Sequence, residues 1–125
     1  MAHPDIISKL VWTEYIKPSM DATLKRLEIK ETAGIYKITN VNNNKAYIGK
    51  SVNVKKRLQE HFKSAVGIQS IADQAFHHEI LKNGIWNWRI EILNYCDKEQ
   101  LSEQEKYYID FFQTQNYGYN KREGG

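Results

Sequence analysis

Apolar residues near the start of the chain recur at the spacing of a helix. The members of this stripe are Ile6, Ile7, Leu10, Val11 and Tyr15. Pro18 interrupts the pattern, and the type of the element that follows over residues 24–29 stays open. We expect residues 1–31 to form an N-terminal extension, made of a short amphipathic helix and a connector, and residues 32–125 to form the main domain.

Two mirror-image tripeptides predict a β-hairpin over residues 33–50. They are Gly34-Ile35-Tyr36 and Tyr47-Ile48-Gly49. In a hairpin, the residue numbers of opposite positions always add up to the same value. A turn of two or four residues therefore places Tyr36 opposite Gly49 and both phenols on one face. A glycine opposite Tyr36 leaves space over the ring, so we expect the hairpin to border a cleft.

Two helices are expected after the hairpin. Asn53 can cap the first, which spans residues 53–64 and has its apolar positions at Val54, Leu58 and Phe62. The second begins near Ser70 or Asp73 and ends at the Asn83-Gly84 signal. Its expected buried residues are Ile71, Ala75, Phe76 and Ile80.

An alternating pattern predicts a third strand over residues 86–95, paired with the hairpin. Its inward positions are Trp86, Trp88, Ile90 and Ile92. Asp97 and Gln100 then stand at the spacing of a capping box, which predicts a last helix that reaches Phe112. A turn-rich aromatic tail follows.

Composition adds limits to this picture. A chain of 125 residues can bury one core, so we expect a single domain with a terminal appendage. No apolar run reaches membrane-spanning length, and no signal peptide opens the sequence. Cys96 is the only cysteine, which excludes an internal disulfide and fits a reducing compartment. We therefore expect a cytoplasmic protein with no membrane partner.

Basic residues gather in one part of the chain. Residues 45–63 hold six basic residues against Glu60 alone, a local charge of +5 in a chain whose net charge is +3. The basic residues are Lys45, Lys50, Lys55, Lys56, Arg57 and Lys63. Such a patch suits a polyanion, and a solvated helix face is the alternative.

Histidines and one arginine are candidates for chemistry. Arg57 and His61 stand four residues apart beside the predicted apolar stripe, where an arginine can bind phosphate and a histidine can move a proton. Two surface residues flanking the stripe are the alternative. His77 and His78 are adjacent on a helix and cannot chelate one ion together, so we expect surface or packing histidines.

Glu105 is the sharpest anomaly, because it falls on the apolar stripe of the last helix with Leu101, Tyr108 and Phe112. Burying an unpaired carboxylate is costly. A second capping box that begins at Ser102 would explain Glu105, but Asp97 competes better because it has a hydrophobic staple as well. The functional alternative is a ligand for a hydrated divalent ion of the magnesium class.

These features resemble the GIY-YIG endonuclease family over about residues 33–120. The matching residues are Gly34-Ile35-Tyr36, Tyr47-Ile48-Gly49, Arg57, His61, Glu105 and Gly118-Tyr119-Asn120. The resemblance implies an α/β fold of the α+β type, with a small three-stranded antiparallel β-sheet flanked by helices. It also implies cleavage of DNA phosphodiesters with Mg²⁺ or Mn²⁺, by a protein that is nucleoid-associated if it is bacterial or from a phage.

The same resemblance implies a role for each matching residue. Tyr36 matches the water-activating tyrosine, Tyr47 the second active-site tyrosine, Arg57 the phosphate-binding arginine, His61 the supporting histidine, Glu105 the metal-binding glutamate, and Asn120 a structural or phosphate-contacting asparagine. Further candidates for substrate binding are Lys50, Lys55 and Lys56. Lys50, which follows the second tripeptide, is also a candidate for lowering a tyrosine pKa.

Several alternatives stay open at this point. Either an ionised Tyr36 or His61 can take the proton of the attacking water, with Tyr36 orienting that water in the second case. The chain can also be a catalytically silent DNA-binding module that kept the fold. A third possibility, suggested by the abrupt end at Gly124-Gly125, is the catalytic part of a larger homing, restriction or repair nuclease.

Overall fold

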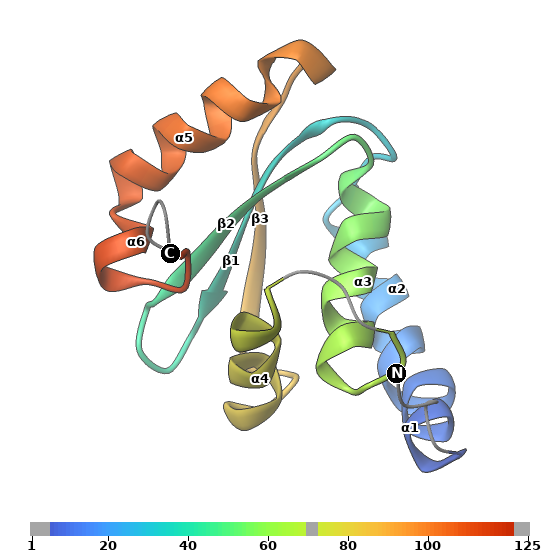
Figure 1. Ribbon diagram of the computed structural model, residues 1–125. Coiled ribbons are helices and arrows are strands. Elements are labelled where there is room, and N and C mark those ends of the chain that lie inside the picture. Colours follow the sequence, from blue (N-terminus) through green and yellow to red (C-terminus); the bar gives the residue numbers. More distant parts are fainter. Residues whose placement is uncertain (1–5, 70–72, 122–125) are drawn as a thin grey trace.

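The computed structural model describes residues 6–69 and 73–121, in which a three-stranded antiparallel sheet has helices on both faces (Figure 1). The strands are β1 (Gly34–Asn40), β2 (Ala46–Ser51) and β3 (Trp88–Tyr95), in the order β2-β1-β3. The helices are α1 (Ile6–Val11), α2 (Lys17–Arg26), α3 (Val54–Ala65), α4 (Gln74–Lys82), α5 (Leu101–Phe112) and α6 (Thr114–Tyr117). The predicted fold class is confirmed. None of the helices in the described ranges has the length and apolar character needed to cross a membrane.

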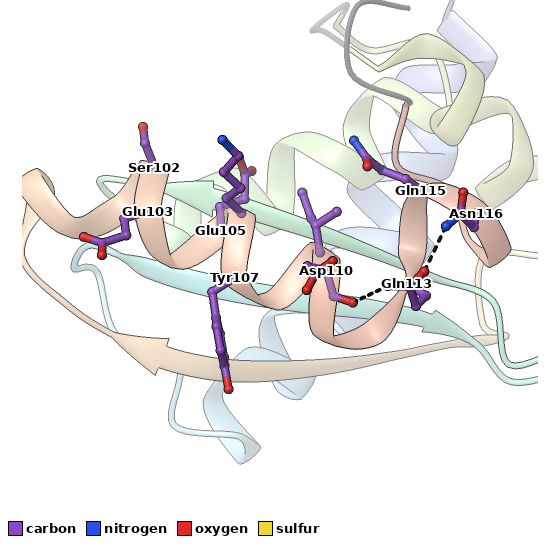
Figure 2. Close-up of a pocket in the computed structure, with 10 residues that line it drawn as sticks. Ser102, Glu103, Glu105, Tyr107, Asp110, Gln113, Gln115 and Asn116 are labelled. Atoms are coloured by element: carbon purple, nitrogen blue, oxygen red, sulfur yellow. Dashed lines mark hydrogen bonds between the residues drawn. The ribbon is translucent and has the colours of Figure 1, made fainter.

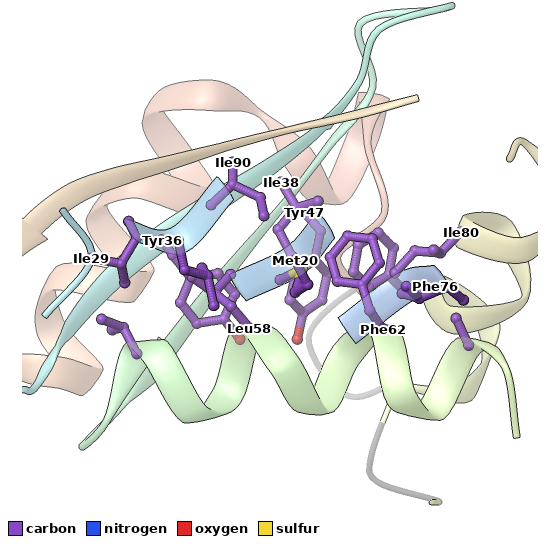
Figure 3. Packing of buried hydrophobic residues seen from close by; sticks show 14 of the residues in the cluster. Met20, Ile29, Tyr36, Ile38, Tyr47, Leu58, Phe62, Phe76, Ile80 and Ile90 are labelled. Carbon is purple, nitrogen blue, oxygen red and sulfur yellow. The ribbon is translucent and has the colours of Figure 1, made fainter. Parts of the chain in front are cut away.

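The predicted hairpin register is confirmed. Tyr36 pairs with Gly49 and Ile38 with Tyr47, and the two phenol rings lie 6.4 Å apart between centroids. The expected open cleft over Tyr36 is wrong, because Tyr36 is only 1% exposed and Tyr47 only 7%. Side chains from α3 and α4 cover this face of the hairpin (Figure 3).

The N-terminal helical segment packs through a different stripe from the one predicted. Its buried residues are Trp12, Ile16, Met20 and Leu24, whereas Ile6, Ile7, Leu10, Val11 and Tyr15 are exposed. Pro18 does not end the helix, because it lies in the first turn of α2, directly after a π-helical turn at Trp12–Ile16, where its missing N–H is tolerated. The segment lies beside α3, and its buried residues belong to the main core (Figure 1). The division of the chain into an extension over residues 1–31 and a main domain stays a prediction.

Two apolar clusters occupy the two faces of the sheet. Tyr36, Ile38 and Tyr47 pack with residues of the N-terminal segment, α3 and α4. On the other face, Ile35 and Ile48 pack against α5 through Leu101, joined by the partly buried Tyr108 and Phe112. The predicted stripe of the last helix is therefore confirmed.

Local end signals fix the starts of α3 and α5. The Asn53 side chain accepts a hydrogen bond from Lys56 N at 3.1 Å and caps α3. Asp97 and Gln100 form the predicted capping box over a 3₁₀ turn, Lys98–Gln100, and α5 follows directly. A four-residue helix, α6, stands where only a turn-rich tail was expected.

Several expectations for α4 and β3 need correction. Ala75 is exposed, because the face of α4 that packs on the core carries Phe76, His77 and Ile80. Ser70 and Ile71 lie outside the described residues. Trp86 precedes β3 and is exposed, so the alternating pattern begins at Trp88.

Candidate active site

Tyr36 and His61 form the buried centre of the site. Tyr36 Oη lies 2.6 Å from His61 Nε2, and His61 is only 2% exposed. Tyr36 comes from the central strand β1, and α3 brings His61 over it because Leu58 and Phe62, on the same side of the helix, belong to the same core cluster. The alternative of His61 as a surface residue is therefore wrong.

Tyr47 is held by α4. Its ring stacks on Phe76, with centroids 4.3 Å apart and planes inclined by 8°. Its hydroxyl donates a hydrogen bond of 2.6 Å to Asp73 Oδ2, at the N-terminal end of α4. Tyr47 also lies edge-on to His61, with 5.4 Å between centroids. Tyr36, Tyr47 and His61 thus form one aromatic cluster beneath α4.

A second histidine extends this cluster. His77 Nε2 lies 2.8 Å from His61 Nδ1, and the His77 side chain is fully buried, whereas His78 is exposed. Sequence reasoning placed His77 as a surface or packing residue and missed this polar contact. A signal was present, because Asp73, Phe76, His77 and Ile80 follow the spacing of one helix face.

Burial sets the protonation of the cluster. Burial raises the pKa of the Tyr36 and Tyr47 hydroxyls far above that of an ordinary phenol, and the Arg57 charge opposes this only in part for Tyr36. Burial also lowers the pKa of His61 well below its usual value and that of His77 to about 4. At neutral pH both phenols keep their protons and both histidines are uncharged.

Glu105 lies on α5, which packs against the opposite face of the sheet. Its carboxylate faces Lys50 of the edge strand β2, with Nζ 3.8 Å from Oε1, and Lys50 Nζ also donates to Ser102 Oγ at 2.9 Å. Burial raises the pKa of Glu105, and the Lys50 charge opposes the rise. Glu105 lines an open pocket of about 710 Å³, whose other lining residues come from α5, α6 and Gln113 between them (Figure 2).

The surroundings of Glu105 fit a hydrated divalent ion. A carboxylate oxygen is a hard donor of the kind that Mg²⁺ prefers, and the adjoining cavity has room for water ligands. Within residues 6–69 and 73–121, no three histidine, cysteine or acidic side chains gather around a common point that would hold a metal. An ion bound at Glu105 would therefore have one carboxylate and water as its donors, and it would compete with the Lys50 ammonium group for that carboxylate.

The predicted basic residues differ in their surroundings. Arg57 contacts Glu60 at 3.6 Å, and its charge lowers the pKa of both Tyr36 and His61, which places it beside the site. Lys56 is exposed, whereas Lys55 lines a groove against α2. Lys45 lies between β1 and β2, Lys50 lies on β2, and Lys63 on α3 has its Nζ 5.6 Å from the centre of the Trp12 ring.

Asn120 binds the edge strand. Its Oδ1 accepts a hydrogen bond from Ile48 N and its Nδ2 donates one to Ile48 O, both at 2.8 Å. Tyr119 N also donates to Ala46 O at 2.9 Å, so both residues attach the tail to β2. These contacts favour the structural alternative among the two roles expected for Asn120.

Comparison with known proteins finds matches to one family of domains. The family model of the GIY-YIG catalytic domain matches residues 32–120. The catalytic domain of the homing endonuclease I-TevI is 27% identical, with a TM-score of 0.64, over 73% of this chain and 99% of that chain. A mutant of the catalytic domain of the intron endonuclease I-TevI is 29% identical, with a TM-score of 0.61, over 72% and 93%. No curated protein gives a significant match.

Proposed function

Because the chain belongs to the GIY-YIG family of nuclease domains, we propose that it is a metal-dependent DNA endonuclease that hydrolyses phosphodiester bonds. The observation that carries the proposal is the buried contact of 2.6 Å between Tyr36 and His61, with Arg57 beside it. A hydroxyl, a neutral imidazole and a fixed cation are the groups needed to orient water and bind a phosphate. The two structural relatives, both described as endonuclease catalytic domains, support the same activity.

Two charged groups would stabilise the transition state. An ion of the magnesium class, when bound at Glu105, would neutralise the charge that develops on the phosphate oxygens. The Arg57 guanidinium would bind the same phosphate through its planar fork. Lys50 would leave Glu105 when the ion binds and become available for a phosphate contact, which is one of the two roles expected for it.

The buried cluster would activate the water. Burial holds the proton on Tyr36, so a phenolate would first have to form, whereas the uncharged His61 already has a free lone pair; burial also lowers the pKa of His61, so its protonated form would be short-lived. We therefore favour His61 as the proton acceptor, with Tyr36 orienting the water and passing the proton on. Tyr47, fixed by Asp73 and Phe76, would hold the cluster in place.

A cleavage assay tests the proposed function. Purified protein would be incubated with plasmid DNA and with single-stranded DNA, with Mg²⁺ or Mn²⁺ and in the presence of a chelator. Metal-dependent cleavage is expected, and Glu105→Gln should abolish it while DNA binding persists. A wild-type protein that cleaves none of these substrates with either metal would refute the proposal.

A catalytically silent DNA-binding module is the competing function, and Arg57→Ala separates the two. In a nuclease this substitution should nearly abolish turnover while DNA stays bound. In a binding module it should only weaken binding and reduce its dependence on salt. Turnover and binding can be measured on the same labelled DNA.

A further inference from the structure

His77 lies behind His61 and has no part in the chemistry described above. Its Nε2 contacts His61 Nδ1 at 2.8 Å, deep in the core. Its other ring nitrogen, Nδ1, has no hydrogen-bond partner within residues 6–69 and 73–121. Burying a half-satisfied imidazole costs free energy that an apolar residue would not cost, so packing alone does not explain His77.

Hydrogen atoms can be arranged along this chain of groups in two ways, because each uncharged imidazole carries one N–H. In the first arrangement, Tyr36 O–H donates to His61 Nε2, and His61 Nδ1–H donates to His77 Nε2. In the second, His77 donates to His61, and His61 donates to the Tyr36 oxygen. The two arrangements place His61 in opposite tautomers.

The geometry favours the first arrangement. A separation of 2.6 Å between Tyr36 Oη and His61 Nε2 suits a hydroxyl donor, whereas N–H donors to oxygen usually lie at about 2.9–3.0 Å. The first arrangement leaves only the His77 Nδ1–H unpaired. The second would leave both His77 Nδ1 and the Tyr36 hydroxyl hydrogen without partners among the described residues.

We propose that His77 is a positioning residue that accepts the His61 Nδ1–H and so holds the His61 Nε2 lone pair toward Tyr36. The inference rests on the proposed nuclease function. As the water oxygen bonds to phosphorus, its proton passes to Tyr36 and the Tyr36 proton passes to His61 Nε2. The bond from phosphorus to the leaving oxygen breaks, and that oxygen takes a proton from solvent. His61 then carries two N–H groups, one of them still bound to His77.

Charged residues on and near α4 act on both His77 and Tyr47. Burial lowers the pKa of His77, the negative charge of Asp73, one turn earlier, opposes this lowering, and the positive charges of Arg57 and His78 add to it. The same Asp73 holds the Tyr47 hydroxyl at 2.6 Å. Asp73 and His77 of this region therefore serve both tyrosines. Asp73 binds the Tyr47 hydroxyl directly, and His77 acts on Tyr36 through His61.

The tautomer of His61 tests the proposal without any cleavage. Two-bond ¹H–¹⁵N correlation spectra of the wild-type protein, without DNA or metal, should show His61 protonated at Nδ1 and unprotonated at Nε2. His77→Gln keeps a carbonyl acceptor and should keep this tautomer, whereas His77→Leu should lose the preference. A wild-type His61 protonated at Nε2 would overturn the proposal, even if His77→Leu fails to fold.

Kinetics supply the second arm of the test. His77→Leu should lower kcat by about 10-fold or more with KM for DNA unchanged, since a positioned proton acceptor contributes roughly 10²–10⁴-fold to such reactions. His77→Gln should recover most of kcat, and His78→Leu, at the exposed neighbour, should match the wild type. A folded His77→Leu protein with wild-type kcat would contradict the role of His77. A wild type that cleaves no DNA would refute the nuclease function alone, because the spectra still decide the tautomer.

Discussion

Tyr36 lies against Gly49, in the space that a side chain at residue 49 would fill. The two residues face each other across β1 and β2, and a Cβ at Gly49 would collide with the Tyr36 ring and hydroxyl. The phenol can therefore lie close to the neighbouring strand while its hydroxyl contacts His61. The glycine of the second tripeptide thus makes room for the tyrosine of the first.

This contact predicts that Gly49→Ala disrupts the contact between Tyr36 and His61, because the new methyl group on β2 would push against the Tyr36 ring. Overpacking should displace the Tyr36 ring and lower the free energy of unfolding by about 1–3 kcal/mol. Cleavage should fall in parallel, because Tyr36 leaves His61. Chemical denaturation measures the first effect and DNA cleavage the second. In a Tyr36→Leu background, which removes the outer ring atoms together with the hydroxyl, Gly49→Ala should cost less stability, and an equal cost in both backgrounds would contradict the proposed collision.

The parts of the fold that could be predicted from sequence are those with local physical causes. The hairpin register follows from the length of the turn, which fixes the residues that face each other across the two strands. The start of α5 follows from the capping box of Asp97 and Gln100. The N-terminal stripe was assigned wrongly because two helical faces there are apolar. Only contacts with the sheet and α3 decide that the face with Trp12 and Leu24 is the buried one.

A substitution at Asn120 tests whether this residue stabilises the fold or contacts the substrate phosphate. Both halves of its amide bind the Ile48 backbone, so Asn120→Asp loses one donor and places a carboxylate against Ile48 O. Each lost hydrogen bond at this half-buried place should cost about 1–3 kcal/mol. Thermal unfolding should therefore shift to lower temperature, while kcat and KM measured on the folded protein at low temperature should stay near wild type. A raised KM for DNA in the folded variant would instead indicate a phosphate contact.

The N-terminal helical segment should contribute strongly to stability. Leu24 is fully buried in the main cluster, so Leu24→Ala should lower the free energy of unfolding by about 2–5 kcal/mol. Leu10→Ala is the matched control, because it makes the same chemical change on an exposed face of the same segment and should cost less than about 0.5 kcal/mol. Urea denaturation measures both. Equal effects would show that the segment does not pack as described.

The candidate site was harder to predict than the fold, because its polar contacts join distant elements. The positions of Tyr36, Arg57 and Glu105 follow from the resemblance to a family. The contact between His61 and His77 depends on how α4 packs over α3, and the ion pair of Glu105 depends on how α5 packs beside β2. The spacing of one helix face indicates that His77 is buried, but it does not identify His61 as its partner, and no local signal predicts the ion pair of Glu105.

The ion pair of Lys50 with Glu105 predicts competition with the metal. Lys50→Met removes a positive charge 3.8 Å from the carboxylate, so the apparent affinity for Mg²⁺ or Mn²⁺ should rise. Both side chains are partly exposed, which limits the expected gain to several-fold. Titrating the metal in the cleavage assay, and binding of Mn²⁺ to the protein alone, measure the change. Lys56→Met is the control at an exposed position of α3, and an equal gain there would indicate only a general charge effect.

Burial of His77 predicts that the protein loses stability between about pH 6.5 and pH 4. Its pKa falls to about 4 in the folded protein, so in this range the unfolded chain binds a proton that the folded chain does not. The free energy of unfolding should therefore decrease as pH falls, by up to about 3 kcal/mol for His77 alone. The lowered pKa of His61 acts in the same direction, and the raised pKa of Glu105 opposes it. Denaturation at pH 7 and pH 5 measures this decrease in the free energy of unfolding. The decrease should be smaller in His77→Gln than in the wild type. In His78→Gln, the control at an exposed position, it should equal that of the wild type. The same loss in His77→Gln as in the wild type would contradict this origin of the acid sensitivity.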